Sequence, residues 1–334
     1  MMKPIPASEK APRQTPAAAK HGRRAFYSQP NRLAFILLPA LLLGAALALL
    51  AKVSGYTDFP TIKIALLLYS LLSCFALLVG AANYPLIARG MEHQWSIIGA
   101  RHGSGPRNLI ALAVIALVGA IQSALLVLIF VPAAKLPAAG NFLPPIAEIW
   151  LPTFITSYTA SALGIFITSL SSGKRSALAA GLAVFLVQVM FTGVMFSIKS
   201  PILSALSYAS VCRWSLVSYG ATADFVKIAT DEGLEKTTGA IGNAYAFISP
   251  LDKKIGGGIK WLKDKVMNSE NTRSTARETI EGLAKRTLEK RGLITGPPKH
   301  SIARAWAILA FFALCLSISA FVAMASKRET ADDR

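Results

Sequence analysis

The sequence has few of the residues on which metal centres, disulfide frameworks and catalytic sites are built. It contains only three cysteines and four histidines in 334 residues, and none of them follows the spacing of zinc ligands. Two of the cysteines lie in apolar runs and the third is far from both in the sequence, so no disulfide is predicted. Gly-x-Ser-x-Gly, His-Glu-x-x-His and a complete phosphate-binding loop are all missing. We therefore predict that this chain alone has no catalytic residue, no metal site and no bound cofactor, and is not an enzyme.

Acidic residues are also scarce. Seventeen Asp and Glu stand against 35 Lys and Arg, which gives a formal net charge of +18. A basic chain can bind nucleic acid, but these cations lie at the ends of apolar runs, in the N-terminal segment and in one long polar segment. No RNP-like or helix-turn-helix context surrounds them. We predict no nucleic-acid partner, and expect the basic residues to meet anionic membrane lipid.

Charge is entirely missing from the interior of six apolar runs. Each run has roughly twenty residues, the length that a helix rising about 1.5 Å per residue needs to cross about 30 Å of hydrocarbon. The whole chain is 53% apolar, with a mean hydropathy of +0.49. We therefore predict an all-α polytopic membrane protein with six transmembrane helices. The six runs are Leu33–Ala51, Ile64–Leu86, Leu109–Ala134, Ile149–Leu170, Ala177–Ser197 and Ala305–Ala325.

The short segments between these runs predict the orientation. Basic residues gather on the cytoplasmic side of membrane proteins. With the N-terminus inside, that side receives most of the short-segment cations, and the outer side receives Lys52, Lys63 and Lys135. Both termini of this multi-pass protein are thus expected in the cytoplasm, and a bacterial inner membrane is the expected location. The predicted cytoplasmic cations are Lys20, Arg23, Arg24, Arg32, Arg89, Arg101, Arg107, Lys174, Arg175, Lys327 and Arg328.

The polar segments suggest a division into four parts. Residues 1–31 are rich in Pro, Ala and basic residues and predict a disordered cytoplasmic tail. Residues 32–227 hold the first five helices, residues 228–301 form a basic amphipathic insertion on the outer side, and residues 302–334 hold the last helix with a short cytoplasmic tail. The insertion predicts two helices, one with Ile255, Ile259, Leu262 and Val266 on one face, and one over Ser274–Arg291 with Ile280 and Leu283 on one face and Glu281 four residues before Lys285. They could lie on an anionic membrane surface or form a solvated hairpin over the outer mouth.

A few polar residues lie within the runs. Thr153, Ser157 and Ser161 follow a spacing of four residues and share one helix face, which suits either close helix packing or a substrate-facing wall. Amide side chains are costly in lipid, so Asn83, Gln122 and Gln188 are expected to face the interior of the bundle. Asn83 and Gln122 suit hydrogen bonds between helices. Gln188 lies beside Phe191 and Thr192, and these three are also candidates to line a substrate pathway.

An ordered series of short motifs extends from Arg32 to Lys227 and includes the last apolar run. In chain order it comprises Gly80-Ala81-Ala82-Asn83, Ser104-Gly105-Pro106, Gln122, Leu163-Gly164, Lys174-Arg175, Gln188 to Phe196, Pro201, Leu206-Ser207-Tyr208, Arg213-Trp214, Tyr219-Gly220 and Asp224. The series resembles the permease domain of ABC-2 type transporters of the ABCG-like class. This resemblance implies a type V exporter-like architecture with a re-entrant outer segment after the fifth helix.

The resemblance also implies a function. It implies a permease half that forms a homodimer or heterodimer and exports a hydrophobic or amphipathic substrate. ATP would be hydrolysed by a separate nucleotide-binding subunit, and the loop from Tyr84 to Arg107 would be the coupling element through Glu92, His93, Trp95 and Arg101. Trp95 suits either an interface anchor or a membrane-surface position. The alternative function is a non-transporting scaffold that displays the basic insertion to lipid, envelope polymer or a protein partner.

Overall fold

The computed structural model describes residues 30–58, 60–102, 104–134, 136–171, 173–192, 201–237, 270–294 and 296–332. All regular elements in this part of the chain are helical, and it contains no strand. The chain divides into two units, residues 1–38 and residues 39–334. Of the first unit only the beginning of α2 is described, so the predicted disordered tail lies almost wholly outside the described residues. All packing below is that of the second unit.

Five helices among the described residues are long and apolar enough to cross a membrane. Their apolar portions are 36–53, 62–83, 105–133, 145–170 and 298–326, in agreement with five of the six predicted runs. The class of polytopic α-helical membrane protein is thereby confirmed. The helices are α2 (Pro30–Val53), α3 (Ile62–His102), α4 (Ser104–Phe130), α5 (Pro145–Leu170) and α12 (Pro298–Asp332).

The predicted span over residues 177–197 is not confirmed. Its helix, α6 (Lys174–Met190), has 17 residues and is too short to count among the five. At about 1.5 Å per residue, such a helix is about 25 Å long, less than the roughly 30 Å of a hydrocarbon layer. The last part of the predicted run, residues 193–197, lies outside the described residues.

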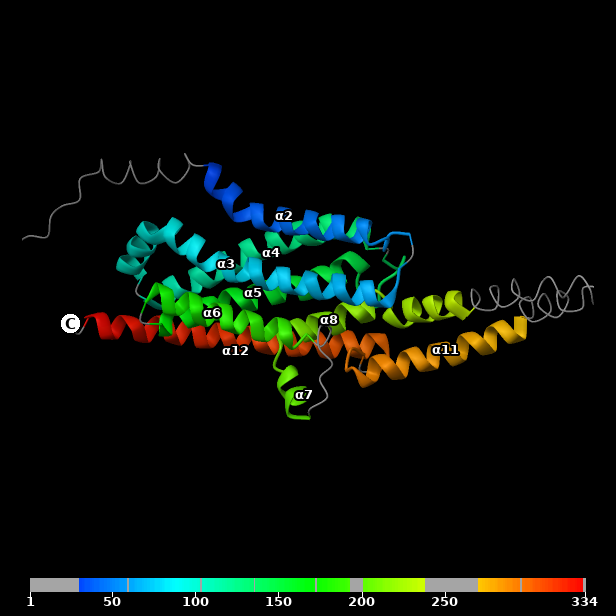
Figure 1. Cartoon of the computed structure of the whole chain (residues 1–334). Helices are drawn as coiled ribbons and strands as arrows, with labels where there is room; N and C mark the ends of the chain where they lie inside the picture. The colour runs from blue at the N-terminus through cyan, green and yellow to red at the C-terminus, as the bar shows by residue number, and fades with distance from the viewer. Residues whose placement is uncertain are drawn as a thin grey trace, which may run out of the picture. The chain divides into compact units, whose positions relative to one another are not determined.

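The predicted loop after the second run is wrong in its structure. α3 continues without interruption to His102, so residues 84–102 are helical rather than a loop. This segment contains good helix formers such as Leu86, Ala88 and Met91, and they outweigh the one intrahelical hydrogen bond that Pro85 cannot make. Figure 1 shows the ribbon of α3 changing direction in its C-terminal part, as expected near an internal proline.

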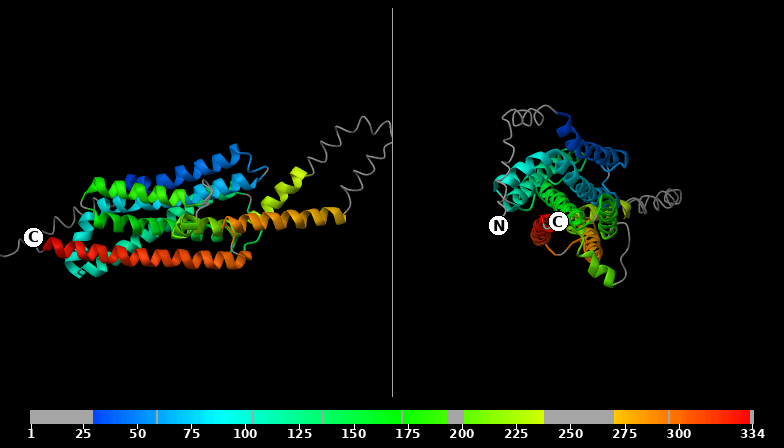
Figure 2. Two further views of the ribbon diagram at one scale, coloured as in Figure 1. Left: turned by 60° about the horizontal axis from the view of Figure 1, so that its bottom comes forward. Right: turned by 90° about the vertical axis from the view of Figure 1, so that its left-hand side faces the viewer.

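Helix α5 lies at the centre of the bundle. It packs against α3, α4, α8 (Val211–Thr222) and α12, and the two views in Figure 2 show these helices side by side. Small and hydroxyl residues on α5 let its neighbours approach closely, which is how membrane helices pack when both lipid and protein are apolar. Eleven residues of α5 are buried. They include Glu148 and six small or hydroxyl residues: Thr153, Thr156, Ser157, Thr159, Ala160 and Ser161.

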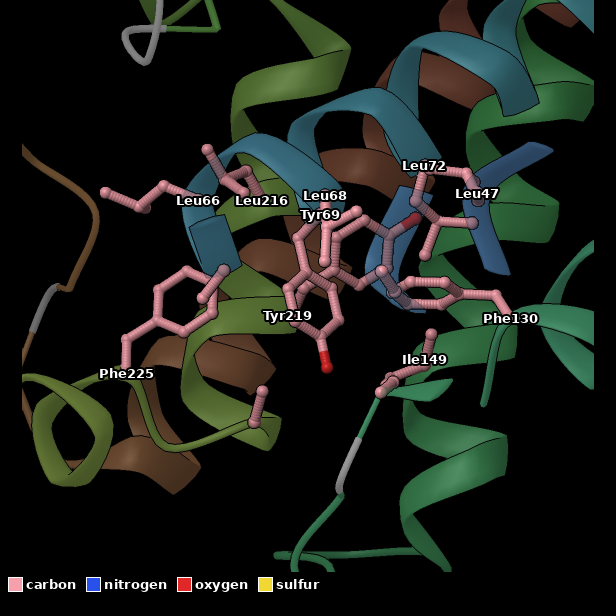
Figure 3. Packing of buried hydrophobic residues seen from close by; sticks show 14 of the residues in the cluster. Leu47, Leu66, Leu68, Tyr69, Leu72, Phe130, Ile149, Leu216, Tyr219 and Phe225 are labelled. Carbon is pink, nitrogen blue, oxygen red and sulfur yellow. The ribbon is translucent and has the colours of Figure 1, made fainter. Parts of the chain in front are cut away.

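An aromatic cluster forms the core at one end of the bundle. Tyr69 of α3 is fully buried, and its ring centroid lies 5.4 Å from that of Phe130, 5.8 Å from that of Tyr219 and 5.5 Å from that of Phe225. Figure 3 shows these rings together with leucines from α2, α3 and α8. Edge and tilted contacts of this kind add to the stabilisation from apolar burial. The cluster fixes α8 against α3.

Two short helices and a helical hairpin follow α6. α7 (Pro201–Ser207) and α8 are both too short to span a membrane, and all twelve residues of α8 are buried. Asp224 then has a positive φ of 52°, and its carboxylate accepts the backbone N–H of Lys227 at 3.1 Å, which begins a helix over residues 225–237. The segments expected to form a re-entrant outer part are therefore short helices: α7, α8 and the helix over residues 225–237.

The insertion folds partly as predicted. The expected helix over Ser274–Arg291 is α11 (Glu270–Lys290). It pairs with the helix over residues 225–237 through an ion pair between Arg277 and Asp231 at 3.6 Å. Ile280 also packs against Gly233, so closely that a Cβ on Gly233 would lie 2.7 Å from Ile280 Cγ2. Leu283, however, is 59% exposed and does not share the buried face of Ile280. The predicted helix with Ile255 and Val266 lies outside the described residues. We call residues 225–237 with α11 the hairpin, and the end of the bundle that carries it the hairpin side.

Candidate functional site

Helices α3 and α5 approach each other closely at Gly80. A Cβ at Gly80 would lie 2.0 Å from the carbonyl oxygen of Ser157, so only glycine permits this approach. Ser161 Oγ donates to the Gly80 carbonyl at 2.8 Å, and Thr153 Oγ1 lies 2.8 Å from the hydroxyl of Tyr219. In the predicted stripe, Ser161 and Thr153 thus bond to neighbouring helices, and Ser157 supplies the backbone carbonyl that Gly80 approaches. This geometry favours the helix-packing role over a substrate-facing wall.

Three polar groups beside this contact are buried in the bundle. Asn83 is fully buried, and neither its amide nitrogen nor its oxygen has a hydrogen-bond partner among the described residues. Ser157 Oγ is also buried without a hydrogen-bond partner among the described residues. It faces Gly119 of α4, where an added Cβ would lie 3.7 Å from it. Gln122, one turn from Gly119, is 1% exposed. Polar groups in a membrane interior face the bundle and concentrate where helices meet, so we take Asn83, Ser157 and the buried amide of Gln122 as the candidate polar site between α3, α4 and α5.

Helix α8 brings a second set of hydroxyl groups into the bundle. Ser215 Oγ lies 2.5 Å from Thr156 Oγ1, and Ser218 Oγ accepts from Trp306 Nε1 at 3.0 Å. At the end of α8, Thr222 Oγ1 donates to the carboxylate of Glu148 at 3.1 Å. These partners come from α5 and α12, far from α8 in the sequence, and the sequence analysis did not identify them. A polar helix that is wholly buried needs such partners, because each unmet hydroxyl would be costly.

Gln188 bonds to the N-terminus of α8. Its Oε1 accepts the backbone N–H of Val211 and the hydroxyl of Ser210, both at 2.9 Å. The side chain therefore satisfies the N-terminus of α8, where backbone N–H groups lack intrahelical partners. Phe191 ends α6 and is half-buried. Thr192 is 1% exposed, and its hydroxyl donates back to Val189 O at 2.8 Å.

The four predicted coupling residues share one helix. Glu92, His93, Trp95 and Arg101 all belong to the helical continuation of α3, and their side chains lie outside the described structure. Residues 62–83 already supply enough apolar helix, at 22 residues, for a hydrocarbon layer of about 30 Å. The segment 84–102 must therefore leave that layer, and it carries its charged residues out of the membrane.

Two buried thiols also meet. Cys74 of α3 and Cys212 of α8 are free, buried and in side-chain contact with each other. The sequence could not indicate this, because 137 positions lie between them. Within the described part of the chain, no group of three or more His, Cys, Asp or Glu side chains is arranged to hold a metal ion.

An acidic residue of the hairpin holds the beginning of α3. Glu232 Oε2 accepts the backbone N–H of Ile62 at 2.8 Å, and Oε1 lies 2.5 Å from Lys236 Nζ. Partial burial alone would raise the pKa of Glu232, but the hydrogen bonds from Lys236 and Ile62 outweigh it and lower the pKa from its ordinary value of 4.5. The charged carboxylate therefore stabilises the contact between the hairpin and α3.

This contact predicts a pH-dependent effect of Glu232→Gln. A lowered carboxylate pKa contributes stability that is fully present above the ordinary pKa and is lost as the pH falls through the lowered value. At pH 7, we expect faster hydrogen exchange at Ile62 and over residues 225–237, because the free energy of local opening there should fall by about 1 kcal/mol. Well below pH 4.5 the variant and the parent should exchange alike. Glu235→Gln, on the same helix but without a bond to α3, is the matched control, and equal exchange of Glu232→Gln and parent at pH 7 would contradict the contact.

The chain was also compared with known proteins. No family model, no curated protein and no solved structure matches it. Its functional assignment therefore rests on the sequence and on the geometry described above.

Proposed function

We propose that this chain is the membrane-spanning subunit of an ATP-driven exporter, with ATP hydrolysed on a separate nucleotide-binding subunit. The chain carries out no chemistry in this account, which agrees with the catalytic motifs that the sequence lacks. Two such halves form the translocating unit, as the resemblance to ABC-2 type permeases implies. The substrate is hydrophobic or amphipathic, and it leaves from the side opposite the termini.

The observation that carries this proposal is the helical continuation of α3. A subunit driven by a partner needs a rigid element that connects the membrane bundle to that partner. α3 is one uninterrupted helix of 41 residues, and its apolar part packs against α5 at the glycine contact of Gly80. Because one continuous helix, bent in its C-terminal part (Figure 1), joins residues 84–102 to this contact, a displacement of that segment would reach the centre of the bundle.

The polar site supports the same function. Asn83 lies at the point where the apolar part of α3 ends, and Ser157 and Gln122 lie deeper in the bundle. The side chains of Asn83 and Ser157 have no hydrogen-bond partner among the described residues, and such groups can gain one in another state or from a bound molecule. We propose that they mark the place where α3, α4 and α5 change their packing during export.

The experiment is co-purification from the native membrane. Detergent-solubilised parent should bring down a protein with a Walker-type ATPase motif, and the preparation should hydrolyse ATP. Trp95→Ala with Glu92→Ala should leave the protein inserted and dimeric and should abolish both, because truncation of an aromatic interface anchor costs about 2 kcal/mol or more. Trp150→Ala with Glu235→Ala, which alters one aromatic and one acidic residue away from the segment 84–102, is the control. Undiminished ATPase binding by the first double variant would contradict the proposal.

One observation favours a second candidate function. The hairpin presents a mixed-charge surface that includes exposed Arg277 and Asp231, and it requires no ATPase to act. A non-transporting scaffold would display this surface to lipid, envelope polymer or a protein partner. The two functions differ in the same experiment, since a scaffold should purify without ATP hydrolysis.

A further inference from the structure

Two arginines and two aromatic rings form a row where α7, α8 and α12 meet. Arg304 Cζ lies 5.7 Å from the centre of the Trp214 ring, the Trp214 and Tyr208 rings are 5.8 Å apart, and Arg213 Cζ lies 4.4 Å from the centre of the Tyr208 ring. Trp214 Nε1 also donates to the carbonyl of Tyr208 at 2.8 Å, which fixes the two aromatic residues together. We call Arg304, Trp214, Tyr208 and Arg213 the cation–aromatic row.

The row carries positive charge without an acidic partner. Arg213 is 5% exposed, and its guanidinium donates to the hydroxyl of Ser207 and to the carbonyl of Arg291 at 3.5 Å, neither of which is charged. Among the described residues, neither Arg213 nor Arg304 forms a salt bridge with an acidic side chain. A buried cation is costly unless an anion compensates it. The row therefore has the electrostatic character of an anion-binding surface.

The backbone makes room for the Arg213 side chain. Gly292 has a φ of +66°, and a Cβ on it would lie 2.2 Å from Arg213 Nη2. Any other residue at this position would be strained and would also displace the guanidinium. The loop after α11 is thus shaped around this one charged group, although the group forms no ion pair within the described chain.

The surrounding sequence strengthens the positive charge. The stretch from Lys290 to Arg304 also contains Arg291, Lys299 and His300, and it contains no Asp or Glu. Arg304 is the last basic residue before the uncharged run Ala305–Ala325 of α12. Trp and Tyr side chains concentrate at the boundary between hydrocarbon and headgroups. A row of cations and aromatic rings before this uncharged run suits the level of lipid headgroups on the hairpin side.

Next to the row is an apolar surface that water would not favour. Ile202, Leu203 and Leu206 of α7 are 72%, 45% and 52% exposed. Figures 1 and 2 show α7 standing out from the side of the neighbouring helices. At the boundary of a membrane, such a surface is covered by acyl chains. Apolar contact for chains and positive charge for a headgroup are thus adjacent.

We propose that the cation–aromatic row binds an anionic phospholipid of the leaflet on the hairpin side. The phosphate of the headgroup is attracted by Arg304 at the surface and by Arg213 beneath Tyr208, and the acyl chains lie along α7. Arginine suits this role because its planar guanidinium matches phosphate oxygens and stacks on aromatic rings. The proposal is independent of ATP coupling, so the exporter and scaffold functions both accommodate it.

The test uses delipidated full-length protein in detergent, with bound lipid counted by native mass spectrometry. Phosphatidylglycerol should bind more tightly than phosphatidylcholine with the same acyl chains. Arg304→Gln should weaken phosphatidylglycerol binding about tenfold, the usual effect of losing one charge-assisted contact. Arg277→Gln removes one positive charge from the hairpin, at a residue with 54% side-chain exposure, and should leave binding unchanged.

Two further variants keep the test decisive. Gly292→Ala should weaken the same binding by displacing Arg213, and Arg213→Lys should retain part of it. If Arg213→Lys does not fold, the Arg304→Gln and Gly292→Ala variants still decide the question. Equal binding of the two lipids, or equal effects of Arg304→Gln and Arg277→Gln, would overturn the proposal. Inorganic phosphate that competes as well as phosphatidylglycerol would identify a soluble-anion site and would also overturn it.

Discussion

Gly80→Ala should unfold the bundle at a markedly lower temperature than the parent. An added Cβ would lie 2.0 Å from the Ser157 carbonyl oxygen, 2.7 Å from its carbon and 2.8 Å from its Cα. All three are backbone atoms, so no side-chain rotation relieves the contact and α3 must move away from α5. Overpacking of this kind typically costs about 1 to 3 kcal/mol, and the displacement would also break the bond from Ser161 Oγ to Gly80 O.

The matched control is Gly181→Ala. Gly181 lies within α6, where a Cβ would meet no atom within 4 Å. Alanine there should be neutral or stabilise the helix by up to about 1 kcal/mol. Thermal unfolding of the two variants in the same detergent measures the difference. If Gly80→Ala melted like Gly181→Ala, the close contact between α3 and α5 would be wrong.

Glu148→Ala, near the N-terminus of α5, should have a still larger effect. Glu148 is fully buried, and its Oε1 accepts the backbone N–H groups of Phe142 and Leu143, the second at 3.0 Å. Its Oε2 accepts the hydroxyl of Thr222. One carboxylate thus joins the segment before α5 to the end of α8. Truncation would leave the two backbone donors without their acceptor, at a cost of about 3 kcal/mol or more. The Thr222 hydroxyl would keep only the Ser218 carbonyl, at 3.2 Å.

Two control variants separate the loss of these hydrogen bonds from the loss of a negative charge. Glu148→Gln keeps one acceptor oxygen and should lose less stability than Glu148→Ala. Glu281→Ala removes an exposed carboxylate from α11 and should leave the unfolding temperature unchanged. Hydrogen exchange at Phe142 and Leu143 locates the change. Unaltered protection of these two amides in Glu148→Ala would contradict the role of the carboxylate as their acceptor.

The spanning helices could be predicted from the sequence because their signal is local. Each of α2, α3, α4, α5 and α12 contains an uncharged apolar run, and length against hydrocarbon thickness is enough to identify it. The same local argument predicts a sixth span at residues 177–197, which the described residues do not confirm. The composition there stays apolar, while the helix itself ends at Met190.

The interior of α8 could not be predicted in this way. The helix contains Arg213, Ser215, Ser218 and Thr222, a polar composition that suggests exposure. It is buried because α5 and α12 supply partners for its hydroxyl groups, and those partners are distant in the sequence. The contact between Gly80 and Ser157 is equally non-local. Sequence motifs could place both residues in helices, but only the packed structure shows that the two backbones touch.

The candidate site was predicted in part for the same reason. Asn83 and Gln122 are buried, as expected of amides in an apolar run. Gln188 was expected to face the interior of the bundle, and its amide holds the N-terminus of α8 there. The partners of Gln188 are Ser210 and Val211, 22 and 23 residues further along the chain, and no local pattern in the sequence predicts this contact. Local polarity indicates which residues need a partner, and the fold decides which partner they receive.

The central claim, that an ATPase drives this chain through the continuation of α3, is tested most directly by site-specific cross-linking. A photo-reactive amino acid at position 95, in the helical segment 84–102, is activated in native membranes, and the cross-linked product is identified by mass spectrometry. The same group at position 283, an exposed site on the hairpin, is the control. We predict that position 95 captures a protein with Walker-type ATPase motifs, that position 283 does not, and that the yield at position 95 changes when a non-hydrolysable ATP analogue is added. Cross-links from position 95 to lipid alone, with no ATPase captured in the presence or absence of nucleotide, would contradict the claim.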